Sequence, residues 1–243
     1  DGTVFWGQGV GARGIAEGEL CFNTSITGYQ EILTDPSYAG QIITFTFPHI
    51  GNVGTNDEDL ETTTPAARGF VLRSLPTEPS NFRSTRRLQD WTASHGLIGI
   101  AGVDTRRVTR HLRDRGPQNA VIWHGDAGTA DLEALKAAAK AAPSLEGLDL
   151  AITVSCRQSY AWSETPWVLG QGFGRQEAPR FKVVAVDYGA KRNILRCLAG
   201  TGAEVVVVPA TATAEDILAH NPDGIFLSNG PGDPAATGEY AVP

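Results

Sequence analysis

The chain has 243 residues, which is enough for two domains that each bury their own core. Hydrophobic residues make up 41% and charged residues 19%, and no apolar run approaches the ~20 residues of a membrane span, so we expect a soluble, globular protein without a membrane segment. The net charge of -7 provides no field that would gather phosphate groups, which argues against nucleic acid as a partner.

The three cysteines, Cys21, Cys156 and Cys197, lie far apart and form no C-x-x-C pair. This spacing predicts reduced thiols in a cytoplasmic protein, with neither a disulfide framework nor a metal site. Cys197 stands among apolar residues of a predicted helix, so we expect an inert, buried thiol there. The chain begins at Asp1 and contains no methionine, which indicates a piece of a longer polypeptide.

A short β-type run at residues 3–6 precedes a G-x-G-x-x-G pattern at residues 9–14. A dinucleotide loop would open a helix, but residues 15–22 alternate like a strand, so nucleotide binding is not predicted. Residues 22–37 are dense in hydroxyl and amide groups, which indicates polar groups positioned for a function. Further strands are expected at 41–47, 69–75 and 97–103, and helices at 85–95, 104–115 and 131–142.

Two features of this N-terminal part invite a functional interpretation. His49 lies in a loop, but no nucleophile is near it in the sequence, and a structural histidine is the favoured interpretation. The expected helix at 104–115 carries five arginines, a pattern more typical of a solvated face than of a surface for an acidic partner. We therefore predict a mixed α+β domain over residues 1–165, without a defensible catalytic cluster.

Residues 166–180 contain Pro166, Gly170, Gly172, Gly174 and Pro179, and this composition predicts a linker. Residues 181–243 then alternate between apolar strands and amphipathic helices.

In this second part, strands are expected at 181–186, 204–208 and 224–228, and helices at 190–199 and from Thr213, capped with Asp216, to His220. This order predicts the first half of a doubly wound, mostly parallel α/β domain. In such sheets, ligands gather at the carboxyl ends of the strands.

The last expected strand is taken to be buried and runs into the turn Ser228-Asn-Gly-Pro-Gly-Asp-Pro234. Gly230 and Gly232 carry amides that no side chain shields, and the proline after Gly230 holds that residue extended. Such a loop can donate backbone hydrogen bonds to a negatively charged oxygen, which is what an oxyanion site needs. By itself, the same motif is also typical of a tight turn after a strand.

Four motifs resemble one family, the small, glutamine-hydrolysing subunit of carbamoyl-phosphate synthase. In the first domain they are residues 22–38 and 48–56, and in the second, which is similar to a class I glutamine amidotransferase, they are residues 187–196 and 228–234. Motifs of this length are specific, and the resemblance covers nearly the whole chain.

The resemblance implies that Gly230 and Gly232 bind L-glutamine, and that Ser37 contacts it from the N-terminal domain. From the residues alone, Ser37 would be a turn serine after Asp35-Pro36. The resemblance also implies a heterodimer with a large subunit. That subunit receives the ammonia released from glutamine and makes carbamoyl phosphate from bicarbonate and ATP for arginine and pyrimidine biosynthesis. ATP and Mg belong to that large subunit, so no cofactor is expected here.

The family's nucleophile is the cysteine of a Gly-x-Cys-x-Gly motif, and none of the three cysteines stands in one. The cysteine, histidine and glutamate of the triad are therefore expected beyond Pro243, and the polypeptide as given is predicted to be inactive. Two alternatives are an amidotransferase of a purine or chorismate pathway, and a non-catalytic scaffold or binding subunit with an amidotransferase-like fold. The N-terminal domain argues against the first.

Overall fold

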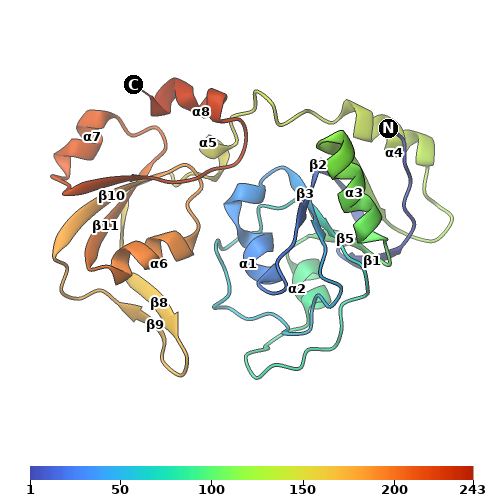
Figure 1. The fold of residues 1–243 in the computed structure, drawn as a ribbon, viewed down its shortest axis with the longest axis horizontal. Helices are drawn as coiled ribbons and strands as arrows, with labels where there is room; N and C mark the ends of the chain where they lie inside the picture. Colours follow the sequence, from blue (N-terminus) through green and yellow to red (C-terminus); the bar gives the residue numbers. More distant parts are fainter. Residues whose placement is uncertain (243) are drawn as a thin grey trace. The chain divides into compact units, whose positions relative to one another are not determined.

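A computed structural model of the chain describes residues 1–242 and divides it into two compact units, Asp1–Leu145 and Glu146–Pro243 (Figure 1). The boundary between the units lies about twenty residues before the expected linker, which was predicted to begin at residue 166. Among residues 1–242, no helix combines the length and the apolar composition needed to cross a membrane.

The first unit is built on a six-stranded sheet in the order β1-β5-β4-β3-β2-β6. Its four central strands run parallel to one another, and the two edge strands pair in the antiparallel sense. The strands are β1 (Gln8–Gly11), β2 (Gly14–Asn23), β3 (Gln41–Phe45), β4 (Gly69–Val71), β5 (Ile98–Ala101) and β6 (Gln118–His124). The helices are α1 (Tyr29–Thr34), the 3-10 turn η1 (Pro36–Tyr38), α2 (Leu88–Ser94), α3 (Thr105–Arg115) and α4 (Leu132–Ala141).

Helices cover both faces of this sheet because successive residues of a strand point to opposite sides. On β3, Ile43 packs with residues of α1 and α2, whereas its neighbour Ile42 packs with Val108 and Leu112 of α3. The five arginines of α3 are all exposed, as expected for a solvated face. The mixed α+β prediction for this part of the chain is therefore confirmed.

Some elements of the first unit differ from the predictions. The expected strand at residues 3–6 is absent, and the first strand is β1, which begins at Gln8, five residues after Thr3. The glycine pattern at 9–14 lies in β1 and at the start of β2, so it opens no helix, as predicted. β6 was not predicted because its sequence, Gln-Asn-Ala-Val-Ile-Trp-His, shows no clean alternation; only Ile122 is fully buried.

The second unit contains a four-stranded sheet in the order β12-β10-β11-β7. β10 pairs in parallel with both β11 and β12, and β7 adds an antiparallel edge. The strands are β7 (Tyr160–Trp162), β10 (Phe181–Asp187), β11 (Ala203–Pro209) and β12 (Gly224–Leu227). The helices are α5 (Ala151–Val154), α6 (Arg192–Gly200), α7 (Ala214–Ala219) and α8 (Pro234–Ala241).

Helices lie on both faces of this sheet as well. Leu195 and Ala199 of α6 pack against one face, whereas Ala151 of α5, Ile217 of α7 and Tyr240 of α8 pack against the other. The capping box of α7 forms as predicted, with Thr213 and Asp216 bonded to each other's backbone N–H groups. The unit is thus the first half of a doubly wound, mostly parallel α/β domain, as predicted.

The expected linker at residues 166–180 is wrong in part, because it contains most of a β-hairpin of β8 (Glu164–Val168) and β9 (Gly172–Arg175). The hairpin is anchored to α6 through Arg196, whose Nε lies 2.7 Å from Glu164 Oε1. The Arg196 guanidinium also lies 3.8 Å from the centre of the Phe173 ring. Of the glycines interpreted as linker residues, Gly170 lies in the turn of this hairpin, whereas Gly172 and Gly174 belong to β9.

Two burial predictions in this unit are also wrong. Cys197 is exposed, because α6 turns Leu195 and Ala199 toward the sheet and Cys197 away from it. The strand β12 was expected to be buried, but Ile225 is 51% and Leu227 58% exposed. Among the described strands, β12 pairs only with β10 and therefore forms an edge of the sheet.

Candidate functional site

The loop Ser228–Pro234 leaves the carboxyl end of β12 and lies beside the residues that follow β10. The Ser228 N–H donates to the Val186 carbonyl at 3.2 Å, and the Tyr188 N–H donates to Ser228 Oγ at 2.9 Å. The Ser228 hydroxyl in turn donates to the Asn229 carbonyl at 2.8 Å. The first residue of the loop is therefore fixed to the carboxyl end of β10, where ligands bind in sheets of this class.

The loop approaches its neighbours so closely that glycine is required at both predicted positions. A Cβ atom on Gly230 would overlap the Tyr188 carbonyl oxygen. Gly232 has φ +86°, and a Cβ there would lie 2.5 Å from the Leu148 oxygen and 2.8 Å from the Leu150 nitrogen. Both glycines thus pack their Cα atoms against backbone, which leaves the loop little freedom to move.

The two glycine amides have no hydrogen-bond partner in the part of the chain that the structure describes. Within residues 1–242, neither the Gly230 N–H nor the Gly232 N–H donates a hydrogen bond. Gly230 is exposed and Gly232 half-buried, whereas Pro231 between them is buried. The loop therefore holds two unused donors on a fixed backbone, which is the arrangement expected of a site for a carboxylate or an oxyanion.

A buried carboxylate, that of Asp187, supports this end of the sheet. Asp187, 6% exposed, accepts hydrogen bonds from the N–H groups of Cys156 at 2.8 Å, Gly189 at 3.0 Å and Ala190 at 2.7 Å. Gly189 has φ +121° and lies against Pro231. Asp187 is the last residue of β10 and the first of the motif at residues 187–196, although no role was predicted for its carboxylate.

Ser37 lies in the first unit, in the 3-10 turn η1. The Asp35 carboxylate caps this turn and accepts the Ser37 N–H at 2.9 Å, as a turn serine after Asp35-Pro36 would require. The side chain is half-buried. Its contact with glutamine stays a prediction.

Two of the three cysteines are unsuited to nucleophilic attack. Burial, with the Glu19 carboxylate adding to it, raises the pKa of Cys21 to about 12. Burial and the nearby Asp187 raise the pKa of Cys156 to about 11. Both thiols are therefore protonated at neutral pH, and the reactive form of cysteine is the thiolate.

His49 is exposed and makes an edge contact with Phe47, 5.8 Å between ring centres, which fits the structural interpretation. Among residues 1–242, no group of three or more histidine, cysteine or acidic side chains could hold a metal ion.

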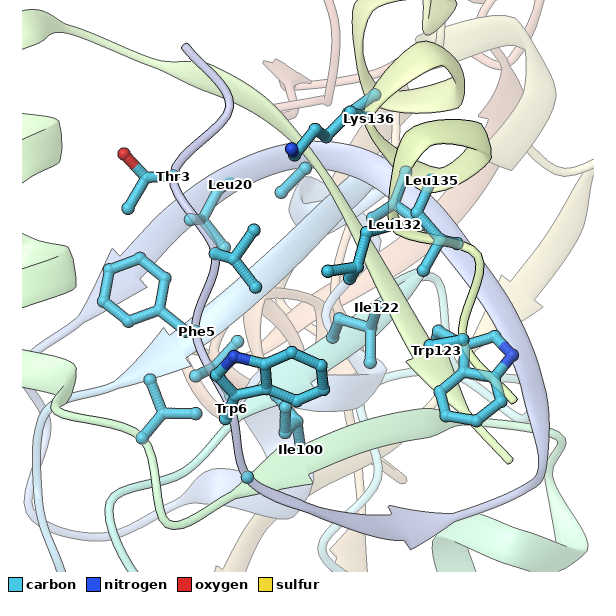
Figure 2. A pocket seen from close by; sticks show the side chains of 18 of the residues that line it. Thr3, Phe5, Trp6, Leu20, Ile100, Ile122, Trp123, Leu132, Leu135 and Lys136 are labelled. Atoms are coloured by element: carbon cyan, nitrogen blue, oxygen red, sulfur yellow. The ribbon is translucent and has the colours of Figure 1, made fainter. Parts of the chain in front are cut away.

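The first unit also contains an apolar pocket of about 920 Å³, shown in Figure 2. Trp6, Ile100, Ile122 and Trp123 line it, together with Leu132 and Leu135 of α4. Ser37 and the polar motif around it are not among the lining residues. The pocket is therefore separate from the predicted glutamine contacts in this unit.

Comparison with known proteins assigns the second unit to a class of proteins. The family profile "Glutamine amidotransferase class-I" matches residues 184–242, which include the end of β10, the loop Ser228–Pro234 and the helix α8. The fold and the loop are thus those of a class I glutamine amidotransferase region.

The profile "Carbamoyl-phosphate synthase small chain, CPSase domain" matches residues 1–122, half of the chain. Proteins named carbamoyl phosphate synthase small chain from Ruegeria pomeroyi and Brucella anthropi are each 62% identical to it, and one from Bradyrhizobium diazoefficiens is 61% identical. Each match covers 100% of this chain and 63%, 61% and 62% of the respective relative. The chain belongs to the carbamoyl-phosphate synthase small chain family, and it spans somewhat less than two thirds of the length of these relatives.

Proposed function

We propose that this chain forms the substrate-binding part of a glutaminase subunit, which releases ammonia from L-glutamine for a large synthetase subunit. The observation that carries the proposal is the pair of unused amides of Gly230 and Gly232, held at the carboxyl ends of parallel strands. Membership in the small chain family supports the same role.

The chemistry of amide hydrolysis explains why such a loop is needed. Attack of a thiolate on the glutamine side chain converts the amide carbonyl into a tetrahedral oxyanion, which must be stabilised at the moment it forms. Donors that are already in place cost no reorganisation then, and one such donor contributes about 3 kcal/mol. In this proposal Gly230 and Gly232 bind the substrate and the loop contributes to the oxyanion site, while Ser37 is a further glutamine contact.

The nucleophile is assigned to the part of the relatives' length that this chain does not span, since Cys21 and Cys156 are protonated and no Gly-x-Cys-x-Gly motif occurs in the sequence. The ammonia would be combined with bicarbonate and ATP on the large subunit, where ATP and Mg would bind. The product, carbamoyl phosphate, would serve arginine and pyrimidine biosynthesis in the cytoplasm.

The test uses the full-length parent chain, alone and with its large subunit. We expect ammonia release from glutamine, and carbamoyl phosphate when the large subunit, bicarbonate and MgATP are added. A parent chain that has another residue in place of the Gly-x-Cys-x-Gly cysteine and releases no ammonia would instead be a non-catalytic scaffold, and the proposal would be wrong.

A further inference from the structure

Asp233 joins the glycine loop to a separate backbone segment of the second unit, residues 147–150. Its carboxylate uses both oxygens: Oδ1 accepts the Ala235 N–H at 2.9 Å, and Oδ2 accepts the Gly147 N–H at 2.8 Å. Its own N–H donates to the Leu148 carbonyl at 3.0 Å. We call the two hydrogen bonds between Asp233 and residues 147–148 the Asp233 clamp.

The clamp acts directly on Gly232. The Leu148 oxygen that accepts the Asp233 N–H is the same atom that a Cβ on Gly232 would approach to 2.5 Å. The backbone is therefore restrained on both sides of Gly232, by buried Pro231 before it and by the clamp on the following Gly232–Asp233 peptide. Movement of residues 147–148 away from Asp233 would release it.

A helix cap alone does not account for this arrangement. Asp233 is the N-cap residue of α8, but capping needs one oxygen, which serine or threonine also supplies. The second oxygen reaches 86 residues back along the chain to Gly147, which adopts φ +76°. A second link, from the Tyr240 hydroxyl to Asp149 Oδ1 at 3.0 Å, ties α8 to the same segment.

We infer that Asp233 is a positioning residue for the proposed reaction: through the clamp it holds the Gly232 amide in the orientation that the oxyanion requires. This inference rests on the proposed function and deepens it, since it assigns an effect on catalysis to residues 147–148, which contact the loop through their backbone. The carboxylate suits the task because its pKa is lowered by the bonds from Ala235 and Gly147, so it stays ionised at neutral pH.

The test is Asp233→Ser in the full-length parent chain. Serine keeps the cap of α8 but is too short to reach Gly147, so the helix and the backbone bond to Leu148 are retained while the side-chain bond of the clamp is lost. We expect kcat to fall about 10-fold or more with KM changed less than about threefold, because a displaced donor acts on the transition state more than on bound substrate. Asp233→Asn, which keeps the size but has one acceptor oxygen, should show the same split if the serine variant fails to fold.

The matched control is Asp131→Ser, which changes the N-cap aspartate of α4, where the carboxylate makes a capping bond to Ala134 and lies far from the loop in sequence. It should leave kcat and KM unchanged. Wild-type kcat in both Asp233 variants, or an equal fall in the Asp131 variant, would overturn the inference and leave the proposed function standing. Absence of glutamine hydrolysis by the wild-type parent chain would overturn both.

Discussion

Replacement of Gly232 by alanine tests whether the loop stabilises the oxyanion or merely binds substrate. The residue has φ +86°, where an L-residue costs about 1 kcal/mol or more. The added Cβ would also lie 2.5 Å from the Leu148 oxygen, closer than Cβ contacts occur, so the loop must shift by several tenths of an ångström. Because the neighbouring atoms are backbone, the cheaper response is to rotate the Gly232 peptide plane and misplace its N–H. Loss of one such donor is worth about 3 kcal/mol, or roughly 100-fold in kcat.

The assay is steady-state ammonia release from glutamine by the full-length parent chain. Gly232→Ala should lower kcat by the stated factor and raise KM much less. The control, Gly238→Ala in α8, makes the same chemical change where the nearest atom to a new Cβ is Val242 Cγ2 at 3.8 Å. It should leave both constants unchanged and stabilise the helix by about 1 kcal/mol. A rise in KM with unchanged kcat for Gly232→Ala would refute the oxyanion role.

Three further predictions concern the chain as given. Burial raises the pKa of Glu31 from 4.5 to about 7, so the contribution of Glu31 to stability is fully present below pH 4.5, where it is protonated in both states, and is lost as pH rises through 7. Glu31→Gln should therefore leave the free energy of unfolding, measured with denaturant, unchanged at pH 4.5 and should raise that of the first unit at pH 8 by up to about 3 kcal/mol. Equal unfolding curves for the variant and the wild type at pH 8 would contradict this. Arg106→Glu replaces an exposed cation in the first turn of α3, and should raise the unfolding free energy by about 0.5 kcal/mol, whereas a loss above ~1 kcal/mol would indicate an unseen partner. The 243-residue polypeptide should release no ammonia above background, and turnover like that of the parent chain would place a nucleophile within it.

The elements that were predicted correctly are those whose local pattern determines them. The run Val183–Val186 of β10 is continuously apolar because helices cover both faces of the strand, and the Thr213 capping box depends on only four consecutive residues. The loop at Gly230 and Gly232 was recognisable because proline and glycine restrict the backbone in known ways. These features depend on few long-range contacts, so a single sequence suffices to find them.

The errors have a common origin in long-range contacts. The hairpin β8–β9 was interpreted as a linker because its glycines and Pro166 resemble one, and the anchor that orders it, Arg196 with Glu164, joins residues 32 apart. The exposure of Cys197 depended on which face of α6 meets the sheet. The Asp233 clamp was not predicted, since nothing in the sequence relates Asp233 to Gly147.

The most direct test of the central claim is a titration of the full-length parent chain with L-glutamine, followed by the ¹H and ¹⁵N resonances of glycine amides. If the loop binds the substrate through its backbone, the amides of Gly230 and Gly232 shift with a common binding constant, while Gly238 on α8 does not. Saturation with glutamine that leaves both Gly230 and Gly232 unshifted would place the substrate elsewhere and contradict the account.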